Sequence, residues 1–138
     1  MTREHGIGWS LVAWLAVGVF WLVATSRFHP TWGLAIIATS TLVFVYAAAA
    51  YINHLLLVPR YWRAGRYGKY VAALGMTMAA LTAVGLAVIR TSYFMTLGPD
   101  PDPNGVYVHY GIDFIGMAFH LIAAAGVVWC VGMLSQCQ

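Results

Sequence analysis

Apolar residues fill four long blocks of the chain, and short polar segments separate the blocks. The blocks cover approximately residues 7–27, 31–58, 68–92 and 111–135. A transmembrane helix needs about 20 predominantly apolar residues, and each block meets that length. Membrane-spanning strands would alternate apolar and polar residues, whereas runs such as 55–58 are continuous. The pattern predicts an all-α integral membrane protein, with one domain over residues 1–138 that forms a bundle of four transmembrane helices.

The composition supports a membrane location. Hydrophobic residues make up 62% of the chain and charged residues 8%, and the mean hydropathy is +0.77. Such a chain has too few polar side chains to cover a water-soluble globule. Its surroundings are therefore expected to be lipid.

The few charges predict how the helices are oriented. The segment between the second and third helices contains no acid and four bases, Arg60, Arg63, Arg66 and Lys69. The opposite end of the bundle carries Asp100, Asp102 and Asp113. Basic loops remain in the cytoplasm, so both termini and the basic loop are expected on the cytoplasmic side of a bacterial inner membrane. There the four bases would contact anionic lipid or partner proteins. They also explain the net charge of +3 without a nucleic acid partner.

Three local signals predict helix ends and packing. Pro30 lies at the expected start of the second helix, and Pro59 is expected to end that helix at the membrane boundary. The loop 91–111 is rich in turn residues, which is typical of a binding element or of a connecting strap. Small residues at packing intervals predict a ridge on the third helix for intramolecular packing or for homo-oligomer formation: Gly75, Ala79, Ala83 and Ala87.

Two histidines fall inside the predicted membrane segments, where a polar side chain suggests function. His54 and His120 differ in expected depth by about 10–15 Å, too far for both to bind one iron. Either could be the single axial ligand of a haem or a bacteriochlorophyll. Ala50 and His54 have a spacing similar to that in antenna polypeptides. The alternative is a neutral imidazole that is hydrogen-bonded to Asn53, to Thr77 or to a backbone carbonyl.

A second group of polar residues lies at the end of the bundle away from the basic loop. His109 and Asp113 are four residues apart on the predicted fourth helix, and His29 belongs to the adjacent turn. These three side chains are of the types that bind a divalent metal. Alternatively, Asp113 stabilises the helix N-terminus as an acid, and the two histidines sense protons because imidazole titrates near neutral pH.

One stretch resembles a known family. The residues 51–61 (YINHLLLVPRY) followed by 66–70 (RYGKY) resemble the membrane-sensing region of LytS-like bacterial sensor histidine kinases. The resemblance rests on Asn53, Pro59-Arg60 and Tyr70, and it implies a four-helix sensor module. In that family a kinase part follows the fourth helix, and it is not found before Gln138. The resemblance therefore implies either a sensor-like membrane module that works with other subunits or a fragment of a longer protein.

No catalytic motif is present in the chain: it has no phosphate-binding loop, Cys-x-x-Cys or His-Glu-x-x-His sequence. We therefore expect a non-enzymatic, sensor-like or accessory subunit that acts through contacts with partner membrane proteins. The alternatives are a tetrapyrrole-binding subunit of a photosynthetic or respiratory complex and, third, a small metal-dependent membrane enzyme.

Overall fold

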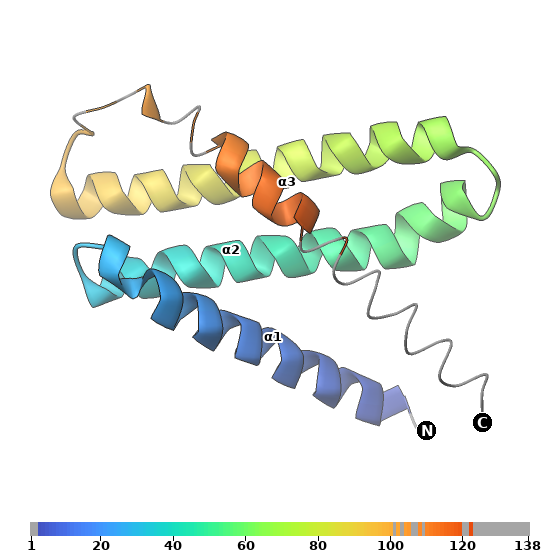
Figure 1. The fold of residues 1–138 in the computed structure, drawn as a ribbon, viewed down its shortest axis with the longest axis horizontal. Coiled ribbons are helices and arrows are strands. Elements are labelled where there is room, and N and C mark those ends of the chain that lie inside the picture. The colour runs from blue at the N-terminus through green and yellow to red at the C-terminus, as the bar shows by residue number, and fades with distance from the viewer. Residues whose placement is uncertain are drawn as a thin grey trace.

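The structure of the protein is a computed structural model that describes residues 3–100, 102, 104, 105, 108, 110–119 and 122; for residues 3–7 and 9 it describes the backbone alone. Three long helices dominate it (Figure 1). Helix α1 spans Arg3–Thr25, α2 spans Trp32–Ile52 and continues as η2 over Asn53–Trp62, and α3 spans Tyr67–Leu97. All three are long and apolar enough to cross a membrane, which confirms the prediction of a helical, membrane-type protein.

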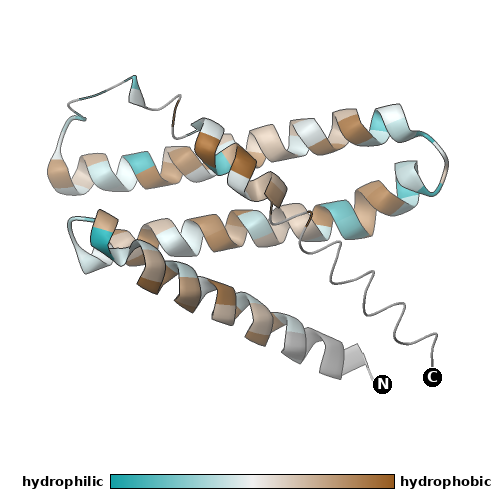
Figure 2. Ribbon diagram, in the orientation of Figure 1, coloured by the Kyte–Doolittle hydropathy of each residue, from teal (hydrophilic) through white to brown (hydrophobic). Residues whose placement is uncertain are grey.

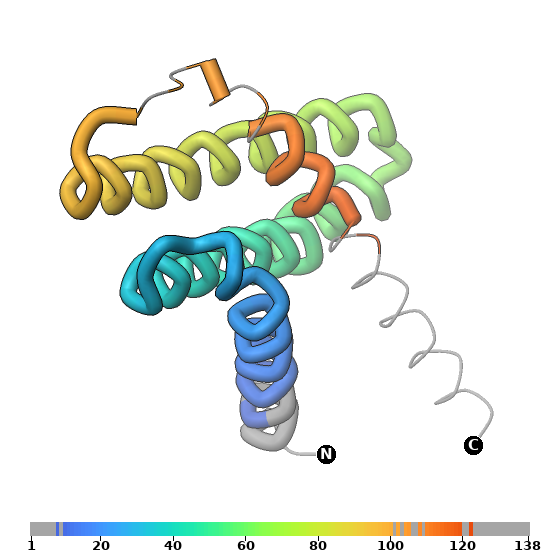
Figure 3. Tube along the Cα trace, turned by 60° about the vertical axis from the view of Figure 1, so that its left-hand side comes forward, coloured from blue at the N-terminus to red at the C-terminus, as the bar shows by residue number. Residues whose placement is uncertain are grey.

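Helix α2 lies between the other two long helices (Figures 1 and 3). Both α1 and α3 contact α2, and within the described residues they do not contact each other. None of the described side chains of α1 is buried. Brown, apolar residues occur along the long helices on their outward faces as well (Figure 2), as expected for surfaces that face lipid.

The turn between α1 and α2 is short. Helix α1 gives way to a single 3₁₀ turn, η1, over Ser26–Phe28. The Thr31 hydroxyl then accepts a hydrogen bond from the backbone N–H of Leu34 at 3.2 Å. This bond satisfies one of the free N–H groups at the helix start, so α2 begins at Trp32, directly after the predicted boundary.

The prediction that Pro59 ends the second helix was wrong. The chain continues through Pro59 to Trp62 in a π-helix, with Arg63 N–H donating to Val58 O and Arg66 N–H to Tyr61 O. Proline lacks an N–H, and in an α-helix its ring clashes with the carbonyl four residues earlier. The wider π-helical turn relieves this clash, so the helix adjusts its winding and does not stop.

Helix α3 ends five residues beyond the predicted limit of 92. The polar side chains in its last turns bond within the helix: the Thr91, Ser92 and Thr96 hydroxyls donate to carbonyls four residues earlier. These bonds let polar residues continue an apolar helix. The helix stops at Gly98, whose φ of 86° favours glycine.

A further apolar helix, Tyr110–Phe119, packs across α2 and α3 (Figures 1 and 3). The Tyr110 hydroxyl donates to the Ala79 carbonyl at 2.8 Å. Met117 is buried against α2, and the backbone at Gly116 passes close to the Tyr46 hydroxyl, which a Cβ there would meet at 3.0 Å. This helix lies within the predicted fourth helix, 111–135, of which 120, 121 and 123–135 lie outside the described residues.

The α2–α3 contact uses a different face of α3 from the predicted ridge. The buried residues of α3 are Met78, Thr82, Gly85 and Leu86. A Cβ at Gly85 would lie 3.2 Å from Val45 Cγ2, so glycine permits this close approach. Of the predicted ridge, Gly75 and Ala79 are half-buried, whereas Ala83 and Ala87 are exposed and do not take part in the described bundle.

Candidate functional site

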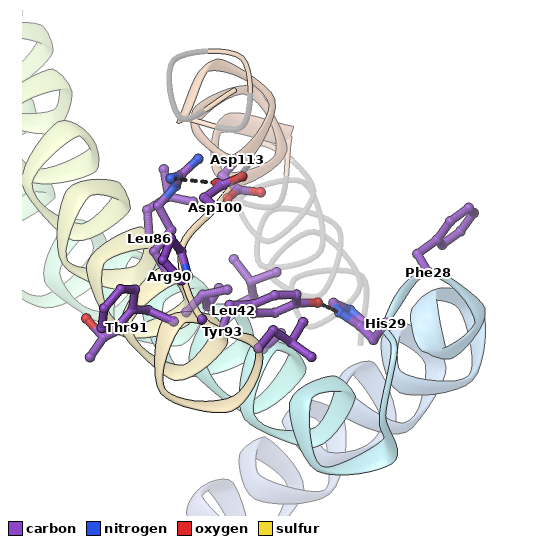
Figure 4. A pocket seen from close by; sticks show the side chains of 15 residues that line it. Phe28, His29, Leu42, Leu86, Arg90, Thr91, Tyr93, Asp100 and Asp113 are labelled. Atoms are coloured by element: carbon purple, nitrogen blue, oxygen red, sulfur yellow. Dashed lines mark hydrogen bonds and ion pairs between the residues drawn. The ribbon is translucent and has the colours of Figure 1, made fainter. Parts of the chain in front are cut away.

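A pocket of about 790 Å³ lies at the end of the bundle away from the basic loop (Figure 4). Four segments contribute to it: the turn after α1, the first turns of α2, the last turns of α3 with the loop behind them, and the helix Tyr110–Phe119. Most of the lining is apolar, with Leu42, Leu86 and Phe94 among its members. The polar lining residues are His29, Arg90, Thr91, Tyr93, Asp100 and Asp113. An apolar cavity with a few converging polar groups is the usual form of a small-molecule site.

His29 and Tyr93 join two of these segments. The His29 Nδ1 atom and the Tyr93 hydroxyl share a hydrogen bond, and their rings lie 6.1 Å apart between centroids (Figure 4). His29 lies between the membrane-spanning segments, and its partial burial lowers the pKa of the imidazole from 6.5. Burial disfavours the charged form, so at neutral pH this histidine is uncharged.

Arg90 and Asp100 form an ion pair on the next side of the pocket. Arg90 lies on α3 one turn before Tyr93, and its Nη1 atom is 3.0 Å from Asp100 Oδ2 (Figure 4). The Gly98 turn brings Asp100 back over the helix, where its Oδ1 also accepts from the backbone N–H of Asp102 at 2.9 Å. Both side chains are partly exposed, at 31% and 45%. The pair therefore contributes less than about 1 kcal/mol to stability, and its main effect is to orient the two charges.

The structure brings together two of the three predicted metal ligands. His29 and Asp113 both line the pocket, while His109 lies outside the described residues. Among the residues that the structure describes, no group of three His, Cys, Asp or Glu side chains converges. The Arg90 guanidinium lines the same cavity, and its positive charge opposes a bound cation. A metal at His29, His109 and Asp113 remains a prediction.

His54, the first predicted tetrapyrrole ligand, lies on η2 and is exposed. Its expected hydrogen-bond neighbours are engaged elsewhere. Asn53 Oδ1 accepts from the Tyr70 hydroxyl at 2.7 Å, and the Thr77 hydroxyl donates to the Ala73 carbonyl. No hydrogen bond to the His54 ring exists within the described part of the chain. His120, the second candidate, lies outside that part.

The four bases of the basic loop are all exposed. Arg60 lies in η2 with its guanidinium 5.7 Å from the centre of the Tyr61 ring, and Arg63 follows the end of η2. Arg66 precedes α3 and Lys69 belongs to its first turn. Among the described residues no carboxylate pairs with any of them. Their charges are therefore available to lipid or to a partner.

Sequence reasoning missed Arg90 and Tyr93 as members of the site. The third helix was expected to end at residue 92, before Tyr93. The useful signal was the spacing of the two residues, since positions three apart lie on one face of a helix. That signal becomes visible only when α3 extends beyond residue 92.

Comparisons of the chain with protein-family models, with curated protein sequences and with solved structures find no match.

Proposed function

We propose that the chain is a non-catalytic, sensor-like subunit of a bacterial inner membrane that works through contacts with partner membrane proteins. In this proposal it crosses the membrane four times, with both termini and the basic loop in the cytoplasm. The four unpaired bases at one end and Asp100 and Asp102 at the other support this orientation. The packing of the apolar helix Tyr110–Phe119 on α2 and α3 supports a fourth crossing.

The pocket is the observation that carries the proposal. Its lining comes from segments as far apart in sequence as Phe28 and Asp113. A ligand that touches all of these segments would alter their relative positions, and such differential contact is what a sensor requires. The pocket would face the outside, at the opposite end of α3 from the basic loop.

The residues that carry the resemblance to LytS-like sensors lie at the junction between η2 and α3. The Asn53–Tyr70 hydrogen bond joins two residues of the resembling stretch, and Pro59 lies within the π-helix between them. The Trp62 ring packs edge-on against Tyr67 and Tyr70, at 4.8 and 5.3 Å between centroids. The residues that carry the resemblance thus form one structural unit at the cytoplasmic end of the proposed topology.

Photo-cross-linking in native membranes tests the partner contacts. A benzophenone amino acid replaces one exposed apolar residue on each long helix in turn: Leu15 on α1, Phe44 on α2 or Val84 on α3. We expect a protein adduct of defined mass from one face, with lipid adducts from the others. Lipid adducts at all three positions, together with a basic loop that cross-links to no protein, would contradict the proposal.

A second function is favoured by one observation, the exposed His54 ring that lacks a hydrogen bond in the described structure. An imidazole at the helix surface with one nitrogen available could bind a haem or a bacteriochlorophyll from the lipid side. A visible spectrum of the protein, purified gently from its native membrane, tests this. An absorption band that is lost in His54→Ala and kept in a His5→Ala control would establish this function.

A further inference from the structure

The polar groups of the pocket present hydrogen-bond donors on two sides of an apolar cavity. Arg90 uses one N–H for Asp100, and a guanidinium carries several more. On the other side, the His29–Tyr93 pair retains one donor in either tautomer. If the tyrosine hydroxyl donates to Nδ1, the Nε2–H remains available; if Nδ1–H donates, the tyrosine O–H remains available.

The charges at this site select against a charged ligand. Arg90 contributes one positive charge, Asp100 and Asp113 contribute two negative charges, and His29 is neutral at pH 7. Because Arg90 is already paired with Asp100, an anionic head group gains little there and is repelled by Asp113, while a cationic head group beside Arg90 is repelled by the guanidinium. An uncharged head group that accepts hydrogen bonds avoids both costs.

The rest of the pocket suits an apolar, ring-containing molecule. Its volume of about 790 Å³ is that of a site for a drug-sized ligand. Leu42, Leu86 and Ile89 supply aliphatic walls, while Tyr93 and Phe94 supply aromatic ones. Because α3 is 31 residues long, about 46 Å, it exceeds the hydrocarbon thickness of about 30 Å. The pocket at its end therefore lies near a membrane surface, where an amphipathic ligand can enter from the lipid.

We propose that this pocket binds an uncharged amphipathic ring compound with two hydrogen-bond-accepting oxygens, the class to which membrane quinones belong. One oxygen accepts from Arg90 and the other from the His29–Tyr93 pair, while the apolar tail lies along Leu42 and Leu86. The inference rests on the proposed sensor function, since it names the ligand of the same pocket. It concerns binding alone and involves no electron transfer.

The test is a binding titration of the purified full-length protein in lipid nanodiscs. The probe is a decyl-substituted benzoquinone, with dodecanol, a monoacylglycerol and a fatty-acid anion as comparison ligands. We expect saturable binding of the quinone that weakens about tenfold in Arg90→Gln and in the double variant His29→Phe/Tyr93→Phe, because each of these loses a hydrogen bond to the ligand whichever tautomer His29 adopts. Arg27→Gln is the matched control, since Arg27 is exposed near the same end and does not line the pocket.

A photoreactive azidoquinone supplies a second measurement on the unaltered chain, which is informative even if a variant fails to fold. We expect the label on the peptide that contains Arg90 and Tyr93. Three results would each overturn the proposal. They are equal binding of quinone to all variants, label spread along α1, and tighter binding of dodecanol, the monoacylglycerol or the fatty-acid anion than of the quinone. A partner adduct that persists without quinone binding would overturn this inference and leave the proposed function standing.

Discussion

The imidazole of His29 and the hydroxyl of Tyr93 share a hydrogen bond although the two residues are 64 positions apart in the chain. Helices α1 and α3 do not contact each other within the described residues. This bond therefore links the turn after α1 directly to the last turns of α3, across the pocket. The link therefore includes one titratable ring, the imidazole of His29.

Acidification should weaken the fold through His29. Burial lowers the pKa of this ring from 6.5, so as the pH falls the unfolded chain takes up its proton before the folded chain does. The contribution of neutral His29 to the free energy of unfolding is complete above about pH 6.5. It is lost as the pH falls through the lower pKa that His29 has in the folded state. Thermal unfolding in detergent between about pH 8 and about pH 5 measures this loss.

The control for the pH series is His29→Asn. The asparagine amide can replace the bond to Tyr93 but does not titrate, while Arg90, Asp100 and Asp113 are unchanged in both proteins. We expect a smaller acid-induced drop in the unfolding midpoint for this variant. Identical pH profiles for the two proteins would show that His29 does not control the stability of this end.

The close approach of Gly116 to Tyr46 predicts a specific double-mutant result. A Cβ at Gly116 would lie 3.0 Å from the Tyr46 hydroxyl oxygen, so Gly116→Ala should destabilise the fold by about 1–3 kcal/mol. Tyr46→Phe removes that oxygen, and the next ring atom is 3.9 Å away. The loss in the double variant should therefore be smaller than the sum of the losses in Gly116→Ala and Tyr46→Phe, as measured by reversible unfolding in mixed micelles.

Gly111→Ala is the matched control, because it lies in the same helix with no atom within 4 Å of its Cβ position. It should be neutral or slightly stabilising, since alanine favours helix more than glycine does. If Gly111→Ala and Gly116→Ala destabilise equally, the contact with Tyr46 is not the cause.

The Asn53–Tyr70 bond should contribute measurably to the η2–α3 junction. Tyr70→Phe keeps the ring packing on Trp62 and removes only the hydroxyl that donates to Asn53. We expect a loss of about 0.5–1.5 kcal/mol in unfolding free energy. Tyr67→Phe, whose ring also packs on Trp62, should have no effect because no hydrogen bond of its hydroxyl exists among the described residues. Equal effects of the two variants would contradict this assignment.

Neutralising the basic loop should disturb the membrane orientation. We expect a mixture of orientations when Gln replaces all four bases of the loop, Arg60, Arg63, Arg66 and Lys69. The reason is that the positive charges that keep this loop in the cytoplasm are then lost. The measurement is labelling of Asn104→Cys by a membrane-impermeant thiol reagent, in a background with Cys130 and Cys137 changed to Ser. Arg27→Gln, at the opposite end, should leave the labelling unchanged. Unaltered labelling after loss of all four bases would contradict the proposed topology.

The pattern of apolar blocks was sufficient to predict the helical class and the three long helices, because backbone groups in lipid must bond within their own segment. Two helix ends were mispredicted for local reasons. Pro59 usually stops an α-helix, yet a change to π winding accommodates it. Thr91, Ser92 and Thr96 look like loop residues, yet their hydroxyls bond back into α3.

The pocket was harder to predict because it depends on contacts between distant segments. The sequence placed His29 and Asp113 at the same end, since His29 follows the first apolar block and Asp113 lies at the start of the fourth, and the structure brings both to one cavity. It did not reveal that Tyr93 bonds to His29 or that the Gly98 turn returns Asp100 to Arg90. These pairings require knowledge of where α3 ends and how the loop behind it turns.

The helices differ in length, and the difference has a consequence for the surrounding bilayer. Helix α1 covers 23 residues, about 34 Å, whereas α3 covers 31 residues, about 46 Å. A bilayer matched to α1 is too thin for α3 unless α3 tilts, and a bilayer matched to α3 must thin beside α1. This hydrophobic mismatch makes the lipid annulus uneven around the protein, so acyl-chain length becomes a variable that shifts how α1 rests against α2.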